Sequence, residues 1–396
     1  MRLLYLVSHY PRWSETFVRQ DVLLLKEAGA DLRLLSLFPG ECPMESGWPK
    51  AEIVQEAFPA SRQASASPKR RLRDMLCPAW LRERISLFRH RKLLEKVKEY
   101  CLRERIDCIY GEFADLAGLL ACQAAKELSS SFPQRQNPSI HATDGSRLPF
   151  LLGLHARDVH AFKYTERLFR EAAAILICNR DARDAFLAKH PFAASRTVLL
   201  PHGIDLRQWE YQPPKCPAHP HRLLFAGRLV PKKGVGLLLE AMRQLPECEL
   251  EVLGTGPLES ALHQQAQGLS VRWAGRCSRD EVRDRMRQAS FLIVPSMVAA
   301  DGDRDGVPNV VLEAMASGLP VIGSQAGSLP EVLTEKTGWP FAEATPECLA
   351  KTIRAAIAAP EECRRHSAAA RSLIEAEYDA QRLAQQRLDI LTNTHA

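Results

Sequence analysis

The sequence predicts an α/β protein with two Rossmann-like doubly wound domains. Its 396 residues are too many for one ordinary core and suit two domains of about 200 residues each. Short apolar segments alternate with segments of helical periodicity in two successive series. Between the series, the stretch YQPPKCPAHP at 211–220 holds four prolines, which favour a linker. We therefore expect a first domain at 1–205, a linker at 206–221, a second domain at 222–375 and a terminal helix at 376–396.

The composition is that of a globular protein with reduced thiols. Hydrophobic residues make up 46% and charged residues 25% of the chain, and no run of about 18 apolar residues could span a bilayer. The opening MRLLYLVSHYPRW is interrupted too early for a signal peptide and reads better as a strand. The 11 cysteines are scattered and include no C-x-x-C pair, which argues against disulfides and zinc ligands. These features predict a cytoplasmic protein.

The first domain is expected to open with a β-α-β unit. An apolar strand at 3–7 precedes a helical segment at 15–28, and a second strand follows at 31–38. Ligands of such sheets bind at the carboxyl ends of the strands. The loop after the first strand lacks a G-x-G-x-x-G pattern, which weighs against a dinucleotide-dependent oxidoreductase. Further strands are expected at 106–110, 174–178 and 197–200, and helices at 114–128 and 181–189.

The stretch DGDRDGVPNVVLEAMASGLPVI at 301–322 carries the strongest functional signal. It reads as a loop, a helix that begins near Pro308 and stops at Gly318, and a short strand. Asp305 lies in the loop, and Glu313 lies about one and a half turns into the helix. The helix start favours an anion and the carboxylates can accept sugar hydroxyl protons, so the stretch outlines a nucleotide-sugar site. The alternative is a buried helix with a capping Asp and an incidental Glu.

This stretch resembles the donor signature of retaining family-4 (group 1) glycosyltransferases of the GT-B fold. The signature is an acidic residue, seven intervening residues and a glutamate; the first residue here is Asp305, where the family usually has Glu. The resemblance implies two Rossmann-like domains that face each other across a cleft. It places the acceptor mainly on the first domain and the sugar nucleotide mainly on the second. It also implies that the terminal helix crosses back to the first domain.

A second motif, GRLVPKKG at 227–234, strengthens the resemblance. Two cations five residues apart follow a strand and precede a helix, and in the family the matching arginine and lysine bind the donor's diphosphate. Asp305 is expected to hold the donor sugar and Glu313 the ribose, while Lys232 is expected to be a solvated neighbour. The donor-binding residues that the resemblance implies are Arg228, Lys233, Gly254, Gly256, Arg276, Asp305, Gly306, Val307, Pro308, Asn309 and Glu313.

Matches on the acceptor side are shorter. Ser14 and Glu15 lie in a segment that resembles the opening of family enzymes of bacterial exopolysaccharide and lipopolysaccharide synthesis; a helix N-cap is the simpler reading of Ser14. The segment HATD, from His141 to Asp144, resembles the family's His-Gly-x-Asp turn, whose histidine faces the transferred sugar. A histidine at a strand end can also be purely structural. We expect His141 and Asp305 to be catalytic, and Ser14, Glu15 and Asp144 to lie on the acceptor side.

The aspartates of 301–305 also imitate metal sites. Asp301, Asp303 and Asp305 match the start of an EF-hand loop, but its twelfth position, which requires Glu, is Leu312. The Asp-x-Asp pair could instead hold a cation on a diphosphate. Enzymes of the family generally bind the diphosphate with helix N-termini and basic side chains, so we expect no metal.

A basic segment runs from Arg62 to Arg105. It holds 14 Lys/Arg against five Asp/Glu, whereas the whole chain has a net charge of +6. Trp80 and Phe88 are interleaved with the arginines, a mixture that can lie on an anionic membrane surface. The alternative is a solvated helix face. No recognised nucleic-acid-binding module accompanies the charge, so no nucleic-acid partner is expected.

The sequence thus predicts a retaining glycosyltransferase. It is expected to move a hexosyl unit from a UDP- or GDP-linked sugar to a hydroxyl of a glycan or lipid-linked acceptor, in bacterial polysaccharide, lipopolysaccharide or glycolipid assembly. No cofactor beyond the donor substrate is expected. The expected location is the cytoplasm, with peripheral contact to the inner face of the cytoplasmic membrane. The alternatives are a nucleotide-sugar epimerase of the same fold and a non-catalytic protein that binds sugar nucleotides at a membrane.

Overall fold

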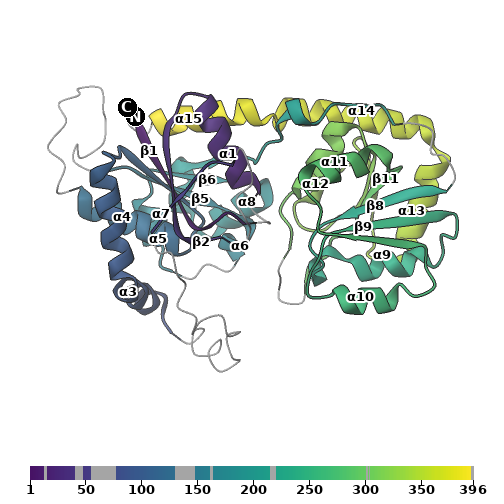
Figure 1. Cartoon of the computed structure of the whole chain (residues 1–396), viewed down its shortest axis with the longest axis horizontal. Coiled ribbons are helices and arrows are strands. Elements are labelled where there is room, and N and C mark those ends of the chain that lie inside the picture. Colours follow the sequence, from purple (N-terminus) through teal and green to yellow (C-terminus); the bar gives the residue numbers. More distant parts are fainter. Residues whose placement is uncertain are drawn as a thin grey trace. The chain divides into compact units, whose positions relative to one another are not determined.

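The protein forms two compact units, each built around one parallel β-sheet (Figure 1). The computed structural model describes residues 1–12, 16–40, 48–54, 77–129, 148–160, 164–214, 220–299, 302 and 304–393. The first unit comprises Met1–Cys178, Ala182–His202 and Ala380–Ala396; the second comprises Asn179–Asp181 and Gly203–Asp379. The prediction of two Rossmann-like α/β domains is confirmed.

The sheet of the first unit has seven strands in the order β3-β2-β1-β4-β5-β6-β7, and all the neighbouring pairs are parallel. The strands are β1 (Arg2–Tyr10), β2 (Asp31–Pro39), β3 (Glu52–Ile53), β4 (Cys108–Glu112), β5 (Phe150–Leu154), β6 (Ala174–Ile177) and β7 (Thr197–Leu199). The helices are α1 (Thr16–Glu27), α3 (Ala79–Arg89), α4 (Arg91–Arg103), α5 (Leu116–Leu128), α6 (Ala156–His160), α7 (Arg167–Glu171), α8 (Arg180–Lys189) and α15 (Ala380–Asn393).

Alternate residues of the strands pack into two hydrophobic cores, one on each face of this sheet. Leu4 and Leu6 of β1 pack with residues of α4 and α5, whereas Leu3 and Tyr5 pack with residues of α1 and α15. This alternation is what a strand covered on both faces requires. Because both faces of β1 are buried, its sequence is an almost unbroken apolar run.

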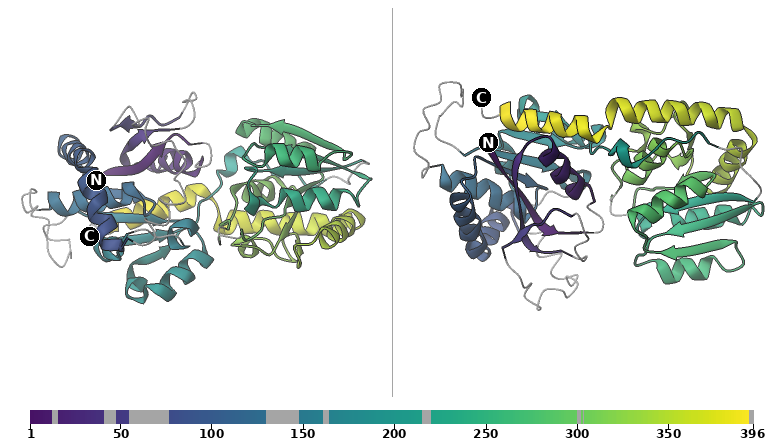
Figure 2. Two further views of the ribbon diagram at one scale, coloured as in Figure 1. Left: turned by 90° about the horizontal axis from the view of Figure 1, so that it is seen from below. Right: turned by 45° about the horizontal axis from the view of Figure 1, so that its top comes forward.

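The C-terminal helix α15 packs against α1 within the first unit, and Figures 1 and 2 show the yellow helix beside the purple one. The sequence places a terminal helix at 376–396, and α15 occupies Ala380–Asn393. A guanidinium–carboxylate hydrogen bond from Arg387 to Asp21 ties the two helices together. Both residues are buried, with 4% and 8% of their surface exposed. Both ends of the chain therefore build one core.

The sheet of the second unit has six parallel strands in the order β10-β9-β8-β11-β12-β13. The strands are β8 (His221–Ala226), β9 (Cys248–Leu253), β10 (Val271–Gly275), β11 (Phe291–Val294), β12 (Val321–Ser324) and β13 (Trp339–Phe341). Its core residues cluster with α9 (Val235–Met242), α10 (Glu259–Gln265) and α13 (Pro346–Ala358) on one face. On the other face they cluster with α11 (Arg279–Gln288), α12 (Asn309–Ser317) and α14 (Pro360–Glu377).

Helix α12 begins and ends where the sequence predicts. Pro308 is its N-cap residue, and Gly318 is its C-cap residue with a φ of 89°. A Cβ atom at Gly318 would lie 2.2 Å from the carbonyl oxygen of Gln212, so both the left-handed φ and the close approach require glycine. The helix is thus fixed between a proline and a glycine, directly after the loop that carries Asp305.

Candidate functional site

The strand order of the second unit creates a ligand crevice beyond β8 and β11. The chain leaves β8 toward β9 on one side of the sheet and later continues from β11 toward β12 on the other, so the connections diverge at this point. In open α/β sheets, such switch points are where ligands bind. The donor residues expected from the sequence follow these strands: Lys233 comes after β8 and Asp305 comes after β11.

The structure brings Lys233 and Asp305 into direct contact. The Lys233 ammonium nitrogen lies 2.8 Å from Oδ2 of Asp305, and the Ser296 hydroxyl donates to the same oxygen at 2.9 Å. Lys232 also approaches Asp305, with its ammonium nitrogen 3.6 Å from Oδ1. The expectation that Lys232 is a solvated neighbour is therefore wrong, since two lysines converge on one half-buried carboxylate.

Backbone hydrogen bonds hold the loops around Asp305 in place. The Met297 amide donates to the Lys232 carbonyl at 2.7 Å, which joins the loop after β11 to the loop after β8. The Ser328 amide donates to the Asp305 carbonyl at 3.2 Å, which joins the loop after β12. The lysines and the aspartate therefore come from loops that support one another and are positioned before any ligand arrives.

The loops after β8, β9 and β10 are joined in the same way. The Leu229 amide donates to Thr255 at 3.0 Å, and the Gly254 amide donates to Gly275 at 2.6 Å. Gly254 has a φ of 125°, and a Cβ atom there would lie 2.0 Å from the carbonyl oxygen of Gly227. A residue with a side chain would force these loops apart, so Gly254 has a structural reason to be glycine.

The remaining expected donor residues line the same edge of the sheet. Arg228 follows β8 and Arg276 follows β10, and both are exposed. A Cβ atom at Gly256 would lie 2.4 Å from the Leu229 carbonyl oxygen, so this turn too is closely packed. The residues at the start of α12 are all half-buried; they are Gly306, Val307, Pro308 and Asn309. A nucleotide at this edge would meet glycine turns, two exposed arginines and a helix N-terminus.

Glu313 is about as buried as Asp305 but faces an arginine instead of two lysines. Its side chain is 13% exposed, and Oε1 lies 3.5 Å from Nε of Arg279 on α11. Burial raises the pKa of Glu313, and the attraction of Arg279 opposes this rise. A carboxyl group in such a position is suited to a directed hydrogen bond with a neutral polar group, such as a hydroxyl.

The first unit holds a histidine that the sequence does not single out. His155 directly follows β5, a strand absent from the sequence-based expectations. The Asp158 carboxylate accepts a hydrogen bond from the His155 backbone amide at 3.0 Å and fixes the turn. The signal that could have found it is the apolar run FLLGL at 150–154, followed by His-x-x-Asp.

Glu112, at the end of β4, holds the His155 ring from one side. Nε2 of His155 lies 2.6 Å from Oε1 of Glu112, whose other oxygen accepts a hydrogen bond from the Tyr5 hydroxyl. Glu112 is fully buried. Burial raises its pKa, but the contacts with His155 and other cations outweigh this and lower it. The following residue, Phe113, has a φ of 73°, a left-handed conformation that is costly for a bulky residue and tends to occur at functional sites.

Cys178 and His202 complete a cluster with His155. Sγ of Cys178 lies 3.8 Å from Nδ1 of His155, and the two imidazole rings stack with centroids 5.0 Å apart. Burial lowers the pKa of His155, but Cys178 and Glu112 outweigh it and raise that pKa well above its usual range. Burial raises the pKa of Cys178, but the two histidines outweigh it and lower that pKa to about 6. The cluster therefore favours a thiolate beside imidazolium groups.

Several expected residues lie outside the described part of the chain. These are the catalytic candidate His141 and the acceptor-side candidates Ser14, Glu15 and Asp144, together with Asp301 and Asp303 of the discarded metal motifs. Their roles stay predictions. Of the described residues, His155 is the histidine that lies at the carboxyl edge of the first sheet directly after a strand, as the resemblance requires of His141.

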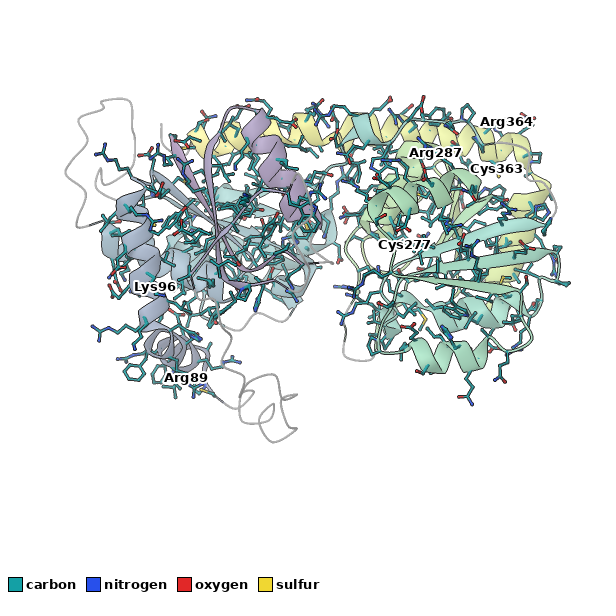
Figure 3. The ribbon with its side chains drawn as sticks, viewed as in Figure 1. Arg89, Lys96, Cys277, Arg287, Cys363 and Arg364 are labelled. Carbon is teal, nitrogen blue, oxygen red and sulfur yellow. The ribbon has the colours of Figure 1, made fainter. Side chains whose placement is uncertain are left out.

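The basic segment forms an exposed surface on α3 and the start of α4. Trp80 is 55% exposed and Phe88 is 81% exposed, and Arg84 lies between them on the same helix face. Figure 3 marks Arg89 at the end of α3, among side chains that project from it. On the opposite face of α3, the buried carboxylate of Glu83 accepts a hydrogen bond from Nε–H of Arg167. This hydrogen bond anchors α3 to α7.

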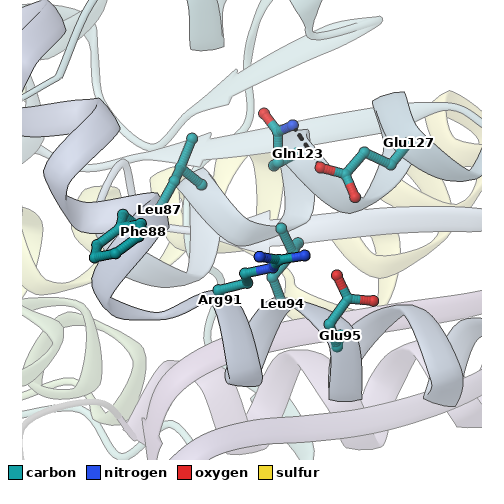
Figure 4. A pocket seen from close by; sticks show the side chains of 7 residues that line it. All are labelled: Leu87, Phe88, Arg91, Leu94, Glu95, Gln123 and Glu127. Atoms are coloured by element: carbon teal, nitrogen blue, oxygen red, sulfur yellow. Dashed lines mark hydrogen bonds between the residues drawn. The ribbon is translucent and has the colours of Figure 1, made fainter.

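A hollow of about 280 Å³ lies beside this surface (Figure 4). Gln123 donates to Glu127 at 2.8 Å across part of its wall. The side chains that line it are Leu87, Phe88, Arg91, Leu94, Glu95, Gln123 and Glu127. Phe88 and Arg91 belong both to the hollow and to the exposed surface, so apolar and cationic groups stand together at its rim. Within the described residues, no helix is both long and apolar enough to cross a membrane.

Comparison with known proteins points to one family. Residues 220–359 match the family described as glycosyl transferases group 1. The amylovoran biosynthesis glycosyltransferase AmsK of Erwinia amylovora is 27% identical over 380 residues, which cover 89% of this chain and 90% of that protein. The putative colanic acid biosynthesis glycosyltransferase WcaL of Escherichia coli K12 is 33% identical over 162 residues, or 39% of this chain and 40% of that protein.

Solved structures share the architecture of both units. The Anabaena protein Alr3699/HepE in complex with UDP matches with a TM-score of 0.70 at 17% identity, covering 99% of this chain and 100% of that one. At this identity the likeness shows the fold alone. Together with other glycosyltransferase neighbours, it identifies the fold as GT-B, as the sequence predicts.

Proposed function

We propose, on the premise that the chain belongs to the group 1 glycosyltransferases, that it transfers a hexosyl unit from a nucleoside-diphosphate sugar to an acceptor hydroxyl with retention at the anomeric carbon. One observation carries this proposal. Lys233 and Lys232 converge on Asp305 at the switch point of the second sheet, where a diphosphate and its sugar would be bound. The expected alternatives, an epimerase and a non-catalytic binder, gain no support from AmsK or WcaL, whose names are those of glycosyltransferases.

The donor-side residues bind the donor in two ways: some by positive charge and others by hydrogen bonds. Arg228 and Lys233 bind the diphosphate and stabilise the negative charge that grows on it as the glycosidic bond breaks. Asp305 exchanges its lysine partner for hydroxyl groups of the donor sugar, and Glu313 accepts from the ribose. A phosphate oxygen of the donor receives the acceptor proton on the same face of the sugar, which gives retention. The nucleoside lies along the turns at Gly254, Gly256 and Arg276.

The proposed donor is UDP- or GDP-linked. Related proteins include one crystallised with UDP-glucose and one named as a GDP-mannose-dependent mannosyltransferase. The proposed acceptor is a glycan or a lipid-linked intermediate of bacterial polysaccharide or lipopolysaccharide assembly, in line with the names of AmsK and WcaL. No metal and no cofactor take part. On the acceptor side we assign the catalytic histidine to His155, because Glu112 already fixes its ring.

The location we propose is the cytoplasmic face of a membrane with anionic lipids. The exposed surface of α3 and α4 presents Trp80 and Phe88 beside four exposed basic residues: Arg84, Arg89, Arg91 and Lys92. Aromatic rings insert at the boundary of headgroups and acyl chains, while each basic residue contributes about 1 kcal/mol near an anionic surface. A lipid-linked acceptor would be reached from such a position.

Binding of sugar nucleotides to the full-length protein tests the donor site directly. A ligand at a hundred times its Kd stabilises the folded state by about 2.7 kcal/mol, so a thermal-shift panel of UDP-, GDP-, ADP- and dTDP-sugars should single out one base. We expect a UDP- or GDP-sugar to raise the midpoint of thermal unfolding most. Lys233→Ala should weaken that ligand roughly tenfold or more, because hydrogen bonds to charged groups contribute about 1.5–3 kcal/mol.

The matched control for this panel is Lys336→Ala, which removes an exposed lysine of the same unit. It should bind the donor as the wild type does. The proposed donor site is contradicted if no sugar nucleotide raises the midpoint of thermal unfolding, or if Lys233→Ala and Lys336→Ala bind the sugar nucleotide equally well.

Removal of divalent metals should leave the transfer rate nearly unchanged. Arg228, Lys232 and Lys233 already supply positive charge where the diphosphate is expected, so no cation is needed to balance it. The measurement is the initial rate before and after EDTA treatment. A loss of rate that magnesium or manganese restores would contradict this expectation.

The protein should float with liposomes that contain anionic lipid and stay behind with neutral ones. Charge attraction dominates such docking and is screened by salt, with a Debye length of about 8 Å at physiological ionic strength, so about half-molar salt should release the protein. Changing Arg84, Arg89, Arg91 and Lys92 to Gln should abolish flotation while leaving nucleotide binding intact.

The control for flotation changes four exposed basic residues of the second unit to Gln: Arg272, Lys351, Arg364 and Arg365. This variant keeps the same net charge as the test variant and should still float. The protein could be recovered equally on anionic and neutral liposomes, or the test and control variants could lose flotation equally. Either result would contradict membrane docking and indicate that the basic segment is a solvated helix face.

A further inference from the structure

A half-buried thiol lies between two imidazole rings at the carboxyl edge of the first sheet. Cys178 directly follows β6, His155 follows β5, and His202 lies just beyond β7. Sγ of Cys178 lies 3.8 Å from Nδ1 of His155 and is also hydrogen-bonded to His202. The two rings are nearly parallel, at 13° to each other with centroids 5.0 Å apart. Because β5, β6 and β7 are neighbours in the sheet, the fold places one sulfur atom beside two groups that can carry positive charge.

Two carboxylates lie on the outer sides of these histidines. Glu112 accepts a hydrogen bond from Nε2–H of His155 at 2.6 Å, and Oδ2 of Asp21 lies 3.5 Å from Nδ1 of His202. Burial lowers the pKa of each histidine, but Cys178 and the carboxylates outweigh it and raise both pKa values. The charges therefore alternate in sign along the row Glu112, His155, Cys178, His202 and Asp21, and each charge lies next to its opposite.

This row of charges keeps Cys178 as a thiolate. Burial raises the pKa of Cys178, but His155 and His202 outweigh it and lower that pKa to about 6. At pH 6, about half of such a thiol is ionised, against about 0.3% of a thiol with the ordinary pKa of about 8.5. The thiolate is the nucleophilic form of cysteine, so Cys178 can react at a pH where ordinary thiols do not.

The sulfur atom is also within reach of small molecules. Cys178 is half-buried, and the side chains of His155 and His202 keep 15% and 14% of their surface exposed. The rings of Phe113 and Phe17 pack on the two imidazoles, with centroids 4.4 Å from that of His155 and 4.1 Å from that of His202. These rings narrow the approach, which favours a small uncharged oxidant over a bulky reagent. A low pKa together with partial exposure is typical of cysteines that peroxides oxidise.

We propose that Cys178 is an oxidation site of the first unit, at which hydrogen peroxide converts the thiolate to a sulfenic acid. The sulfur attacks one peroxide oxygen, so that an S–O bond forms and the O–O bond breaks. The leaving hydroxide takes a proton from an adjacent imidazolium and departs as water. Sulfur gives up two electrons, and the peroxide accepts them. A small thiol reverses the change: it first forms a mixed disulfide with release of water, and a second thiol then restores Cys178.

Oxidation changes the surroundings of His155. It removes the negative charge of the sulfur, takes a proton from one imidazolium and adds an oxygen atom between the rings. The alternating row of charges is then broken beside the histidine to which we assign the catalytic role. The expectation that oxidation slows hexosyl transfer rests on the proposed function, whereas the reactivity of Cys178 does not.

Peroxide treatment of the full-length protein at pH 6, without donor or acceptor, tests the oxidation site. Peptide mass spectrometry after alkylation in denaturant measures the thiol that remains at each cysteine, and dimedone marks the sulfenic acid. The matched comparison is Cys277, a half-buried cysteine labelled in Figure 3, whose pKa is raised by burial. We expect Cys178 to be oxidised at least ten times faster than Cys277.

The pH dependence gives a second signature of the thiolate. From pH 6 to pH 8 the rate at Cys178 should rise only about twofold, because half of its thiol is already ionised at pH 6. The rate at Cys277 should rise about a hundredfold, since the ionised fraction of a thiol far below its pKa grows tenfold with each pH unit. A steep rise at Cys178 equal to that at Cys277 would contradict the proposal.

A pair of histidine variants tests the arrangement. His202→Gln removes one imidazolium and should slow the oxidation of Cys178 at pH 6 at least fivefold. The control is His263→Gln, which changes an exposed histidine of the second unit and should leave that rate unchanged. Circular dichroism identifies a variant that fails to fold, and the wild-type comparison does not depend on the variants. The proposal is overturned if Cys178 is oxidised no faster than Cys277 at pH 6, or if the two folded histidine variants behave alike.

The transfer assay separates this proposal from the proposed function. The oxidised protein should lose most of its transfer rate and regain it with dithiothreitol. Unchanged transfer by protein whose Cys178 is oxidised would contradict the coupling to His155. A chain that transfers no sugar at all would contradict the proposed function, yet its Cys178 would still be oxidised first.

Discussion

Asp305→Asn is expected to lower kcat/KM for the donor sugar by roughly 10- to 150-fold, which corresponds to the loss of a charged hydrogen bond of about 1.5–3 kcal/mol. The substitution keeps the size of the side chain and its contact with the Ser296 hydroxyl, but removes the negative charge that faces Lys233. Because the proposed partner of Asp305 is the donor sugar, the loss should appear in the transfer rate. Binding of the free nucleoside diphosphate should change much less, since Arg228 and Lys233 remain.

The matched control is Asp280→Asn, which neutralises a carboxylate on α11 that is 79% exposed. Steady-state kinetics and calorimetric binding of UDP and GDP separate the two effects. If Asp305→Asn transfers sugar at the wild-type rate, or loses nucleotide binding and transfer in equal measure, Asp305 does not have the proposed role.

Arg387→Met is expected to destabilise the protein by about 3–5 kcal/mol, the usual cost of removing one partner from a buried ion pair. The guanidinium of Arg387 bonds the Asp21 carboxylate, and both residues are buried. The pKa of Arg387 is raised, because the attraction of Asp21 and of other acidic groups outweighs the effect of burial, which lowers it. Methionine fills much of the same space but leaves Asp21 charged and unbalanced in the core.

Chemical denaturation followed by circular dichroism measures this loss. The control is Arg382→Met, an exposed position on the same helix, where a surface ion pair contributes at most about 1 kcal/mol. Similar stability losses in the two variants would mean that the buried pair contributes no more than a surface pair. Restoration of stability in the double variant Asp21→Leu, Arg387→Met would support the account, because an apolar pair can replace a buried ion pair.

The donor side of the site could be predicted because its signals are local. Pro308 and Gly318 set the ends of one helix, and GRLVPKKG at 227–234 sets one turn, so short segments of sequence determine both. What the sequence could not show is that Lys232 shares Asp305 with Lys233. That contact depends on where β8 and β11 lie in the sheet, which no local pattern reports.

The acceptor side could be predicted less well, and the reason is also physical. A five-residue apolar run such as FLLGL cannot be told from a buried helix segment by periodicity alone, so β5 and His155 went unassigned. The HATD segment resembles a family turn, and the assignment of His141 that rests on it stays a prediction, since His141 lies outside the described residues. The environment of His155 is made by Glu112 and Cys178, from two other strands, and their meeting is a property of the sheet order.

The position of α15 has a consequence for synthesis of the chain. The second unit is drawn almost entirely from one continuous stretch, Gly203–Asp379, whereas the first unit takes in residues from both ends. During translation, the first 202 residues emerge long before the helix that covers α1. The guanidinium of Arg387 can reach Asp21 only after the whole of the second unit has been synthesised, so this carboxylate has no Arg387 partner while that unit is being made. The domain that is made first is therefore the one that is completed last.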